Sequence, residues 1–436
     1  MPKIAIIGAG SVIFAKQLIS DILSQPALTR CTLSLMDIDP NKLALTGAVA
    51  RRLIKDNGLG AKVEETTDRR AALNGADYVL CLVQIGGIDI VEKDITIPSK
   101  YGINQAVGDT LGPAGIVRAQ RSIPVILDIA RDMEELCPDA WLLNYTNPMV
   151  MITKALYMET KIKALGLCHA VQGTVERLAA LLEMPIEELT YWVAGINHMA
   201  WVLRLEDPAG NDLYPRLFAA LEDPTLYGQD KIGFEMLKYF GYFVTESSHV
   251  SEYVPYLRQR PELVEYFGVP EGRVLINTRK RMAKEPAKIK DMLESPGKLS
   301  LDLSGEYASR IMNSLETGEM LRINANVQNT NLITNLPQGS CVEVPCLVDK
   351  AGVHPCHVGA LPSQLAALCN SNVSVQDLAV EAILEENLEK LIQAIALDPL
   401  TAATCTLPEI WEMSIELLQS QREMLPPGIL AQLDRL

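Results

Sequence analysis

The chain contains a cysteine and a histidine in settings where such side chains could bind a divalent metal. Cys168 and its neighbour His169 directly follow an apolar, strand-like run at residues 164–167, and His198 lies among small and apolar residues at 194–199. A thiolate and an imidazole from separate segments could hold one ion whose remaining coordination positions are taken by substrate oxygens. A buried thiol and a hydrogen-bonded core histidine are the commoner roles of these residue types, so spacing alone leaves both interpretations open.

A second group of metal-binding residue types consists of Cys346, His354, Cys356 and His357. Their spacing matches none of the common tetrahedral zinc patterns, in which ligands are paired at both ends. We therefore interpret this stretch as a polar loop.

Polar side chains in three further segments could bind or deprotonate a polyhydroxylated substrate. Asn147 follows a strand-like run at 141–145, although turn chemistry before Pro148 accounts for it equally well. Asp109 lies in a glycine-containing loop where its carboxylate could accept hydroxyl hydrogen bonds, and the alternative is a helix start. Residues 245–256 concentrate ionisable side chains, a composition that is also typical of a solvated loop.

A glycine turn near the start of the chain could bind a dinucleotide. Gly8 permits a tight turn after an apolar run at residues 4–7, and Gly10 lets the backbone approach a pyrophosphate at a helix N-terminus. Ile13 occupies the place of the usual third glycine. A second apolar run ends at Asp37, whose carboxylate could bind both ribose hydroxyls and would repel a 2′-phosphate, which favours NAD over NADP. A βαβ unit that binds FAD, another nucleotide or nothing is the alternative.

The elements that carry these residues alternate between strand-like and helix-like patterns over the first third of the chain. Short apolar runs bounded by Gly, Asp or Asn predict buried strands, and the amphipathic stretches between them predict helices. The expected strands are 4–7, 32–36, 78–83, 141–145 and 164–167, and the expected helices are 14–24, 41–56, 118–137 and 148–158. Strand alternating with helix predicts an α/β fold with a Rossmann-like, doubly wound parallel sheet.

The pattern changes after about residue 189. Residues 190–206 are rich in β-forming types, 208–330 are mostly helix-like, and 338–348 again resemble a strand. The segments 375–397 and 407–418 predict amphipathic helices. We expect residues 1–189 to form a nucleotide-binding domain and residues 190–436 to form a second, mixed α/β domain.

Composition restricts the class of protein. The chain has 436 residues with a formal net charge of −15, which argues against nucleic acid or an anionic membrane as a partner. No apolar stretch is long enough to span a bilayer. Hydrophobic residues make up 48% and charged residues 21%, which is ordinary for a folded protein. Nine scattered cysteines suit a reducing cytoplasm better than a disulfide framework.

Taken together, the motifs resemble those of one known family, and the resemblance extends over nearly the whole chain. The chain resembles the NAD- and manganese-dependent glycosidases of glycoside hydrolase family 4, and within them the α-galactosidases. The residues that carry the resemblance are Ile7-Gly8-Ala9-Gly10-Ser11, Met36-Asp37-Ile38-Asp39, Gln84-Ile85-Gly86-Gly87, Asp109-Thr110-Leu111-Gly112-Pro113, Asn144-Tyr145-Thr146-Asn147-Pro148, Cys168-His169-Ala170-Val171-Gln172-Gly173-Thr174, Gly195-Ile196-Asn197-His198-Met199, Gly241-Tyr242-Phe243-Val244-Thr245-Glu246-Ser247-Ser248 and Asn335-Leu336-Pro337-Gln338-Gly339.

The resemblance implies a fold, two cofactors and a set of roles. The fold would be that of lactate and malate dehydrogenases with an added C-terminal domain, and the cofactors would be NAD⁺ and a divalent metal, usually Mn²⁺. Cys168 and His198 would be the metal ligands, and Tyr253 the base that deprotonates sugar C2. His169 would protonate the leaving oxygen, and Asp109, Asn147 and His169 would contact the substrate. The residues implied to bind NAD are Gly8, Gly10, Ser11, Ile13, Asp37, Gln84, Gly86 and Asn147.

The implied reaction hydrolyses α-galactosides through transient oxidation. Sugar C3 is oxidised by NAD⁺, C2 is deprotonated, the C1–O bond breaks by elimination, water adds at C1, and C3 is reduced again. Phosphosugar members of the family carry an arginine where this chain has Gln84 and an Asn or Asp where it has His169, so an unphosphorylated substrate is expected. The resemblance also implies a homodimer or homotetramer.

Other functions compatible with the sequence remain open. An α-glucosidase or α-galacturonidase of the same family would use the same machinery. A 2-hydroxy-acid dehydrogenase on this scaffold would produce NADH stoichiometrically and would not need Cys168. A catalytically silent NAD-sensing protein would need neither Cys168 nor His198, so their joint presence argues against it.

Overall fold

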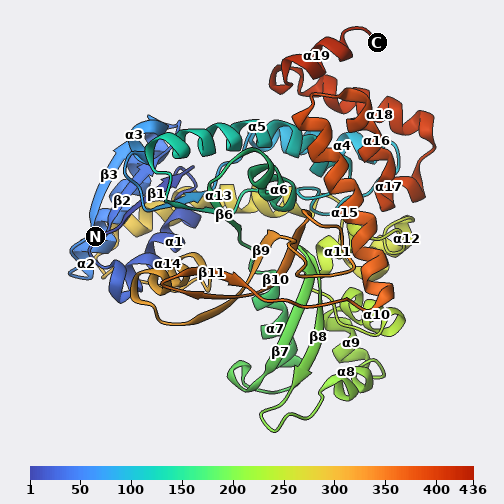
Figure 1. Ribbon diagram of the computed structural model, residues 1–436, viewed down its shortest axis with the longest axis horizontal. Helices are drawn as coiled ribbons and strands as arrows, with labels where there is room; N and C mark the ends of the chain where they lie inside the picture. Colours follow the sequence, from blue (N-terminus) through green and yellow to red (C-terminus); the bar gives the residue numbers. More distant parts are fainter.

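The computed structural model describes all 436 residues and is built around one mixed β-sheet (Figure 1). Its strands run in the order β3-β2-β1-β4-β5-β6-β9-β10-β7-β8, and β11 pairs with β10. Their bounds are β1 Lys3–Ile7, β2 Thr32–Met36, β3 Lys62–Thr66, β4 Tyr78–Cys81, β5 Trp141–Asn144, β6 Lys163–Gly166, β7 Thr190–Ile196, β8 Met199–Glu206, β9 Leu321–Gln328, β10 Cys341–Asp349 and β11 Gly352–Pro355.

Helices follow most of the strands. Their bounds are α1 Val12–Ser24, α2 Pro40–Asp56, α3 Arg69–Leu73, α4 Gly87–Lys100, α5 Gly112–Leu136, α6 Met149–Glu159, α7 Ala170–Leu181, α8 Tyr214–Ala220, α9 Pro224–Gln229, α10 Lys231–Phe240, α11 Ser247–Tyr253, α12 Pro261–Phe267, α13 Arg273–Glu294, α14 Ala308–Thr317, α15 Ser363–Leu384, α16 Leu388–Leu397, α17 Pro399–Thr404, α18 Leu407–Ser420 and α19 Pro427–Leu433. None of these helices combines the length and the apolar character that a membrane span requires.

Strands β1 to β6 form the parallel part of the sheet and confirm the predicted fold class. β1 pairs in parallel with β2 on one side and with β4 on the other, and β5 and β6 extend the same parallel order. The five expected strands all exist, and their near-continuous apolar character follows from burial on both faces. Because all six strands point the same way, their carboxyl ends meet at one edge, which is where open α/β sheets bind ligands.

The antiparallel strands continue the same sheet. β6 meets β9 in antiparallel pairing at Gly166 and Asn326, and β9 then pairs with β10, and β10 with β7. A cluster of 102 buried residues includes side chains from both parts of the sheet. The expected boundary between residues 189 and 190 therefore falls within one continuous sheet. In Figure 1 the hairpin of β7 and β8 extends downward beside α8 and α9, and the C-terminal helices lie at the upper right.

The structure differs from the expected elements in several places. Strand β9 lies in the stretch 208–330 that was expected to be mostly helical, and helices α3 and α7 were not expected. β3 was missed because its sequence, Lys-Val-Glu-Glu-Thr, forms a largely exposed edge strand without an apolar run. α4 was missed because it contains six β-branched residues and an internal proline, Pro98, which weaken the helical signal. The single helix expected at 375–397 is two helices, α15 and α16. The chain turns at Glu386, which has a left-handed φ of 50°, and Asn387 then caps α16 by accepting from the Lys390 N–H.

Candidate functional site

Cys168 and His198, the two predicted metal ligands, lie next to each other in the structure. Cys168 comes two residues after β6, at the carboxyl edge of the parallel strands, and His198 occupies the turn between β7 and β8. The distance between Cys168 Sγ and His198 Nε2 is 3.3 Å. Strands β9 and β10 connect β6 to β7 and so bring the hairpin to this edge.

The backbone at His198 is unusual. The turn between β7 and β8 consists of Asn197 and His198 alone, and His198 has a φ of 64°. A left-handed conformation is unfavourable for a residue with a Cβ, and such residues gather at functional sites. This tight turn aims the imidazole at Cys168.

The chemistry of the pair fits a divalent ion. Burial and the nearby His249 lower the pKa of His198 well below its usual range, so the neutral imidazole has one ring-nitrogen lone pair that could bind a metal. Burial raises the pKa of Cys168, and a bound cation would favour the thiolate instead. The two donor atoms are close enough together that both could bind one divalent ion.

The predicted metal site would have two protein ligands. No three side chains among His, Cys, Asp and Glu come together anywhere in the chain in a way that could hold a metal ion. The residues around Cys346 do not form a metal cluster, and their stretch is not the expected polar loop but a β-hairpin, in which the buried Cys346 lies in β10 and His354 lies in β11. His354 and His357 contact Asp349 and the Asn331 carbonyl. A metal at Cys168 and His198 would keep coordination positions open for substrate, as catalytic sites do.

Asp109 and Asn147 converge beside this pair from two different loops. Asn147 Nδ2 donates to Asp109 Oδ2 at 2.9 Å, and Asp109 Oδ1 lies 3.1 Å from His249 Nε2. The ring of His249 stacks on that of His198, with 3.7 Å between their centroids. Burial opposes the ionisation of both Asp109 and His249. Their mutual contact outweighs it, lowering the pKa of Asp109 and raising that of His249 to about 9.

His249 has no role in the sequence prediction, which assigned a role only to Tyr253 within the polar segment 245–256. Three of the five histidines, His169, His198 and His249, reach the carboxyl edge of the sheet. Only the packing of α11 against the Asp109 loop makes His249 part of the site.

Tyr253, the predicted base, is buried beside the same cluster. It ends α11, is 1% exposed, and donates from its hydroxyl to Thr110 Oγ1 at 2.9 Å. Its ring centroid lies 6.5 Å from that of His198. Burial raises the pKa of Tyr253 well above its usual value, so a base at this position needs a nearby cation.

His169 lies at the rim of the site. Its side chain is 69% exposed, and its Nδ1 is 3.3 Å from Glu306 Oε1. The hydrogen bond to Glu306 and the charge of that carboxylate raise the pKa of His169. The imidazole is therefore in a position to hold a proton while remaining accessible.

Two buried polar residues near Cys168 were also missed. Glu343 lies in β10 opposite Gly195, and burial raises its pKa to about 8. The amide of Asn197 lowers the pKa of both Cys168 and Glu343, although it forms no hydrogen bond of good geometry with either. The sequence signal that could have indicated Glu343 is a glutamate placed between two valines in an otherwise apolar strand.

The glycine turn forms a cradle of the kind that dinucleotides occupy. Gly10 N donates to Asp37 Oδ2 at 2.6 Å, and Asp37 Oδ1 accepts from Asp39 N at 2.9 Å. A Cβ at Gly10 would lie 2.6 Å from the Asp37 carboxylate, and one at Gly8 would lie 2.9 Å from the Leu82 backbone. The close approach of the Leu82 backbone therefore requires glycine at position 8, and a Cβ at position 10 would displace the Asp37 carboxylate from its hydrogen bond with Gly10 N. The turn fits a dinucleotide.

The other residues predicted to bind NAD border the same edge. Ser11 is exposed at the N-terminus of α1, and Ile13 is half-buried and packs against the core. Gln84 is exposed after β4, and Gly86 adopts a left-handed φ of 91° where α4 begins.

Replacing Gly10 by alanine is expected to weaken NAD⁺ binding by roughly 10- to 100-fold, because the added Cβ would displace the Asp37 carboxylate that would bind the ribose, and a lost hydrogen bond to a charged group costs about 1.5–3 kcal/mol. Isothermal titration with NAD⁺ measures the change. Gly228→Ala is the matched control, because a Cβ there meets nothing within 4 Å. Equal affinities in the two variants would show that the Gly10 turn does not hold the cofactor.

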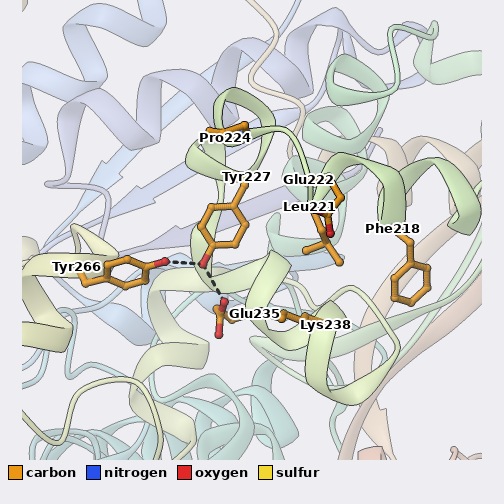
Figure 2. A pocket seen from close by; sticks show the side chains of 8 residues that line it. All are labelled: Phe218, Leu221, Glu222, Pro224, Tyr227, Glu235, Lys238 and Tyr266. Carbon is orange, nitrogen blue, oxygen red and sulfur yellow. Dashed lines mark hydrogen bonds between the residues drawn. The ribbon is translucent and has the colours of Figure 1, made fainter.

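A surface pocket of about 500 Å³ lies elsewhere, between α8, α9, α10 and α12. Figure 2 shows Tyr227 at the centre of this pocket and Phe218 to one side. The Tyr227 hydroxyl is hydrogen-bonded to Glu235 and to the Tyr266 hydroxyl. None of the predicted site residues lines this pocket. It is thus separate from the cluster around Cys168.

The parallel sheet, the glycine turn and the carboxyl-edge cluster define a Rossmann-like protein with an added antiparallel part. Residues 3–184 match the model for family 4 glycosyl hydrolase, and residues 193–401 match that for the family 4 glycosyl hydrolase C-terminal domain. The chain belongs to family 4 of the glycosyl hydrolases.

Individual relatives agree with this assignment. An alpha-galactosidase from Bacillus subtilis (strain 168) is 41% identical over 434 residues, which is 98% of this chain and 99% of the relative. The crystal structure of lplD from Bacillus subtilis has a TM-score of 0.86 at 27% identity, covering 96% of this chain and all of the other. The 6-phospho-beta glucosidase of Thermotoga maritima, solved with manganese, NAD+ and glucose-6-phosphate, has a TM-score of 0.81 at 23% identity and covers 97% of this chain and 99% of that one.

Proposed function

We propose that this protein hydrolyses α-galactosides by a reaction that depends on NAD⁺ and a divalent metal. The observation that carries the proposal is the contact of Cys168 with His198, at the sheet edge where the Gly8–Gly10 turn also lies. The choice of galactoside is supported by the 41% identity to an alpha-galactosidase over nearly the full length of both chains.

Two groups of residues would hold the cofactors. Gly8, Gly10 and Asp37 would cradle NAD⁺, with Gln84 and Gly86 along the same edge, while Cys168 and His198 would bind Mn²⁺. When bound, NAD⁺ supplies reversible oxidation of sugar C3, and the metal supplies Lewis-acid polarisation of neighbouring oxygens.

The chain's own side chains would then do the proton chemistry. Tyr253 would take the proton from C2, and His169 would give a proton to the leaving oxygen at C1. Asp109 and Asn147 would hold sugar hydroxyls, since carboxylate and amide groups both accept from them. A base and an acid on separate elements, α11 and the start of α7, suit an elimination across C1 and C2.

The proposal is tested with p-nitrophenyl α-galactoside and enzyme stripped of cofactors. Activity is expected only when NAD⁺, Mn²⁺ and a thiol reductant are restored together, with no net NADH. Stoichiometric NADH would indicate a dehydrogenase instead, and full activity of the stripped enzyme would rule out the redox reaction.

Galactoside 6-phosphates are expected to be poor substrates, with kcat/KM at least about 10-fold below that of the free α-galactoside. Gln84 offers no cation, and Arg121, which donates to the Ile85 carbonyl in the same loop, is buried and paired with Asp94. A phosphate would therefore lack its natural bidentate partner. Parallel kinetics on the two substrates check this, and a preference for the phosphorylated sugar would contradict it.

We further propose a cytoplasmic location, a homodimer or homotetramer, and a domain boundary at residues 189/190. The location is supported by nine free cysteines, because a thiolate metal ligand needs a reducing compartment. Light scattering of the purified protein tests the assembly, and limited proteolysis tests the boundary.

A further inference from the structure

Three side chains of helix α11 contact the loop that carries Asp109. His249 and Tyr253, near its two ends, contact Asp109 and Thr110. Between them, Glu252 is 3% exposed and has no catalytic role in the proposed reaction.

The Glu252 carboxylate accepts hydrogen bonds from the backbone of that loop. Its Oε1 accepts from Val107 N at 2.5 Å, and its Oε2 accepts from Gly108 N at 3.0 Å and from Gln105 Nε2 at 3.3 Å. Gln105 in turn donates to the Leu111 carbonyl and accepts from Ala114 N. The backbone just before Asp109 is thus tied directly to one buried carboxylate, and Gln105 links that carboxylate to the residues after Asp109.

Arg258 balances this buried charge and holds the start of the loop. Its Nε donates to the Asn104 carbonyl at 2.6 Å, and its Nη1 donates to the Val269 carbonyl at 2.8 Å. Burial lowers the pKa of Arg258, and the charge of Glu252 opposes that effect. Glu252 and Arg258 therefore secure neighbouring parts of the same segment.

The loop needs such support because its own backbone is permissive. Gly108 and Gly112 both have left-handed φ values, 60° and 67°, and flank the residues that reach the site. Glycine loses more conformational freedom on ordering than any other residue. Two charge-assisted hydrogen bonds to adjacent backbone amides oppose that loss where Asp109 must be aimed.

We propose that Glu252 is a positioning residue for the reaction, which sets the distance between the Asp109 loop and the α11 side chains His249 and Tyr253. The proposal rests on the proposed function. A carboxylate can accept from both amides, whereas a glutamine carboxamide would turn an NH₂ donor towards one of them. The mispositioned loop would then misplace substrate and base together, and a shift of about 1 Å can cost roughly 100-fold in rate.

The test compares Glu252→Gln, Glu252→Asp and wild type, all loaded with NAD⁺ and Mn²⁺. In Glu252→Gln, hydrogen exchange of peptides spanning residues 105–110 should accelerate at least about 10-fold, and kcat/KM on p-nitrophenyl α-galactoside should fall roughly 10- to 100-fold. Glu252→Asp keeps the charge and should restore part of both. Glu386→Gln is the matched control, because Glu386 also accepts a backbone N–H, from Gly428, but in the C-terminal helices.

The outcomes distinguish failure of the positioning role of Glu252 from failure of the proposed α-galactosidase function. Unchanged exchange at residues 105–110 in Glu252→Gln, or faster exchange with unchanged kcat/KM, would overturn the positioning role. If Glu252→Gln does not fold, the Glu252→Asp variant provides the test. Wild-type hydrogen exchange and wild-type kcat/KM in Glu252→Asp, whose side chain is shorter, would also overturn the positioning role. A wild-type enzyme without α-galactosidase activity would overturn the proposed function instead, while exchange at residues 105–110 still decides whether Glu252 orders the loop.

Discussion

Cys168→Ser is expected to lose metal-dependent hydrolysis by roughly 1,000-fold or more, because Lewis-acid activation contributes several kcal/mol. Serine removes the soft anionic donor that lies 3.3 Å from His198 Nε2 while changing the side-chain volume little. The fold and NAD⁺ affinity should stay native, because the Gly8–Gly10 turn is a separate part of the edge. Turnover with Mn²⁺, Mn²⁺ affinity by electron paramagnetic resonance, and NAD⁺ titration together measure the effect.

The matched control for this prediction is Cys405→Ser. Cys405 is also half-buried and free, but its thiol contacts the Tyr101 carbonyl away from the site. The Cys405→Ser variant should retain wild-type turnover and Mn²⁺ affinity. Near-native turnover of Cys168→Ser at saturating Mn²⁺ would show that Cys168 is not a ligand.

Tyr253→Phe is expected to lower kcat by roughly 100- to 10,000-fold with little change in KM, as for loss of a general base. The phenol is buried on α11, and its hydroxyl contacts only Thr110 Oγ1 among the side chains. Loss of this one hydrogen bond should cost only about 1 kcal/mol of stability. Kinetics and thermal unfolding on the same preparations separate the two effects.

Tyr214→Phe serves as the control, because Tyr214 is a partly buried tyrosine whose hydroxyl contacts only backbone groups, donating to the Val202 carbonyl and accepting from Phe243 N. The kcat of Tyr214→Phe should equal that of the wild type.

If C2 is deprotonated in each turnover, galactose released by wild-type enzyme in D₂O should carry deuterium at C2, seen as loss of the H2 proton resonance. Substrates deuterated at C2 and at C3 complete the test, since no rate effect at either position together with no deuterium uptake would leave the redox reaction without support.

Contiguous residues were enough to predict the nucleotide cradle and the parallel sheet. Gly8, Gly10 and Asp37 belong to one β1–α1–β2 unit, in which strand, turn and helix follow each other along the chain. The apolar runs of β1, β2, β4, β5 and β6 are the direct result of burial on both faces of a parallel sheet. Where that condition fails, as in the charged edge strand β3, the prediction failed too.

The side-chain cluster at the sheet edge depends on contacts between distant segments. Cys168 could be placed at the edge because it follows β6, but His198 reaches it only through the antiparallel pairing of β9, β10 and β7. The contact of His249 with Asp109 joins residues 140 positions apart, and that of Glu252 with Gly108 joins residues 144 apart.

The periodicity of the sequence does not indicate such pairs. Each partner is compatible with its own helix, strand or loop whether it contacts the other or lies in solvent. Hydrophobic patterning specifies which face of an element is buried, whereas a polar pair forms only after packing has removed water from both of its members. The cradle is therefore encoded locally. Which histidine, carboxylate and tyrosine meet at Cys168 was decided by how α11 and the β7–β8 hairpin pack on the parallel sheet.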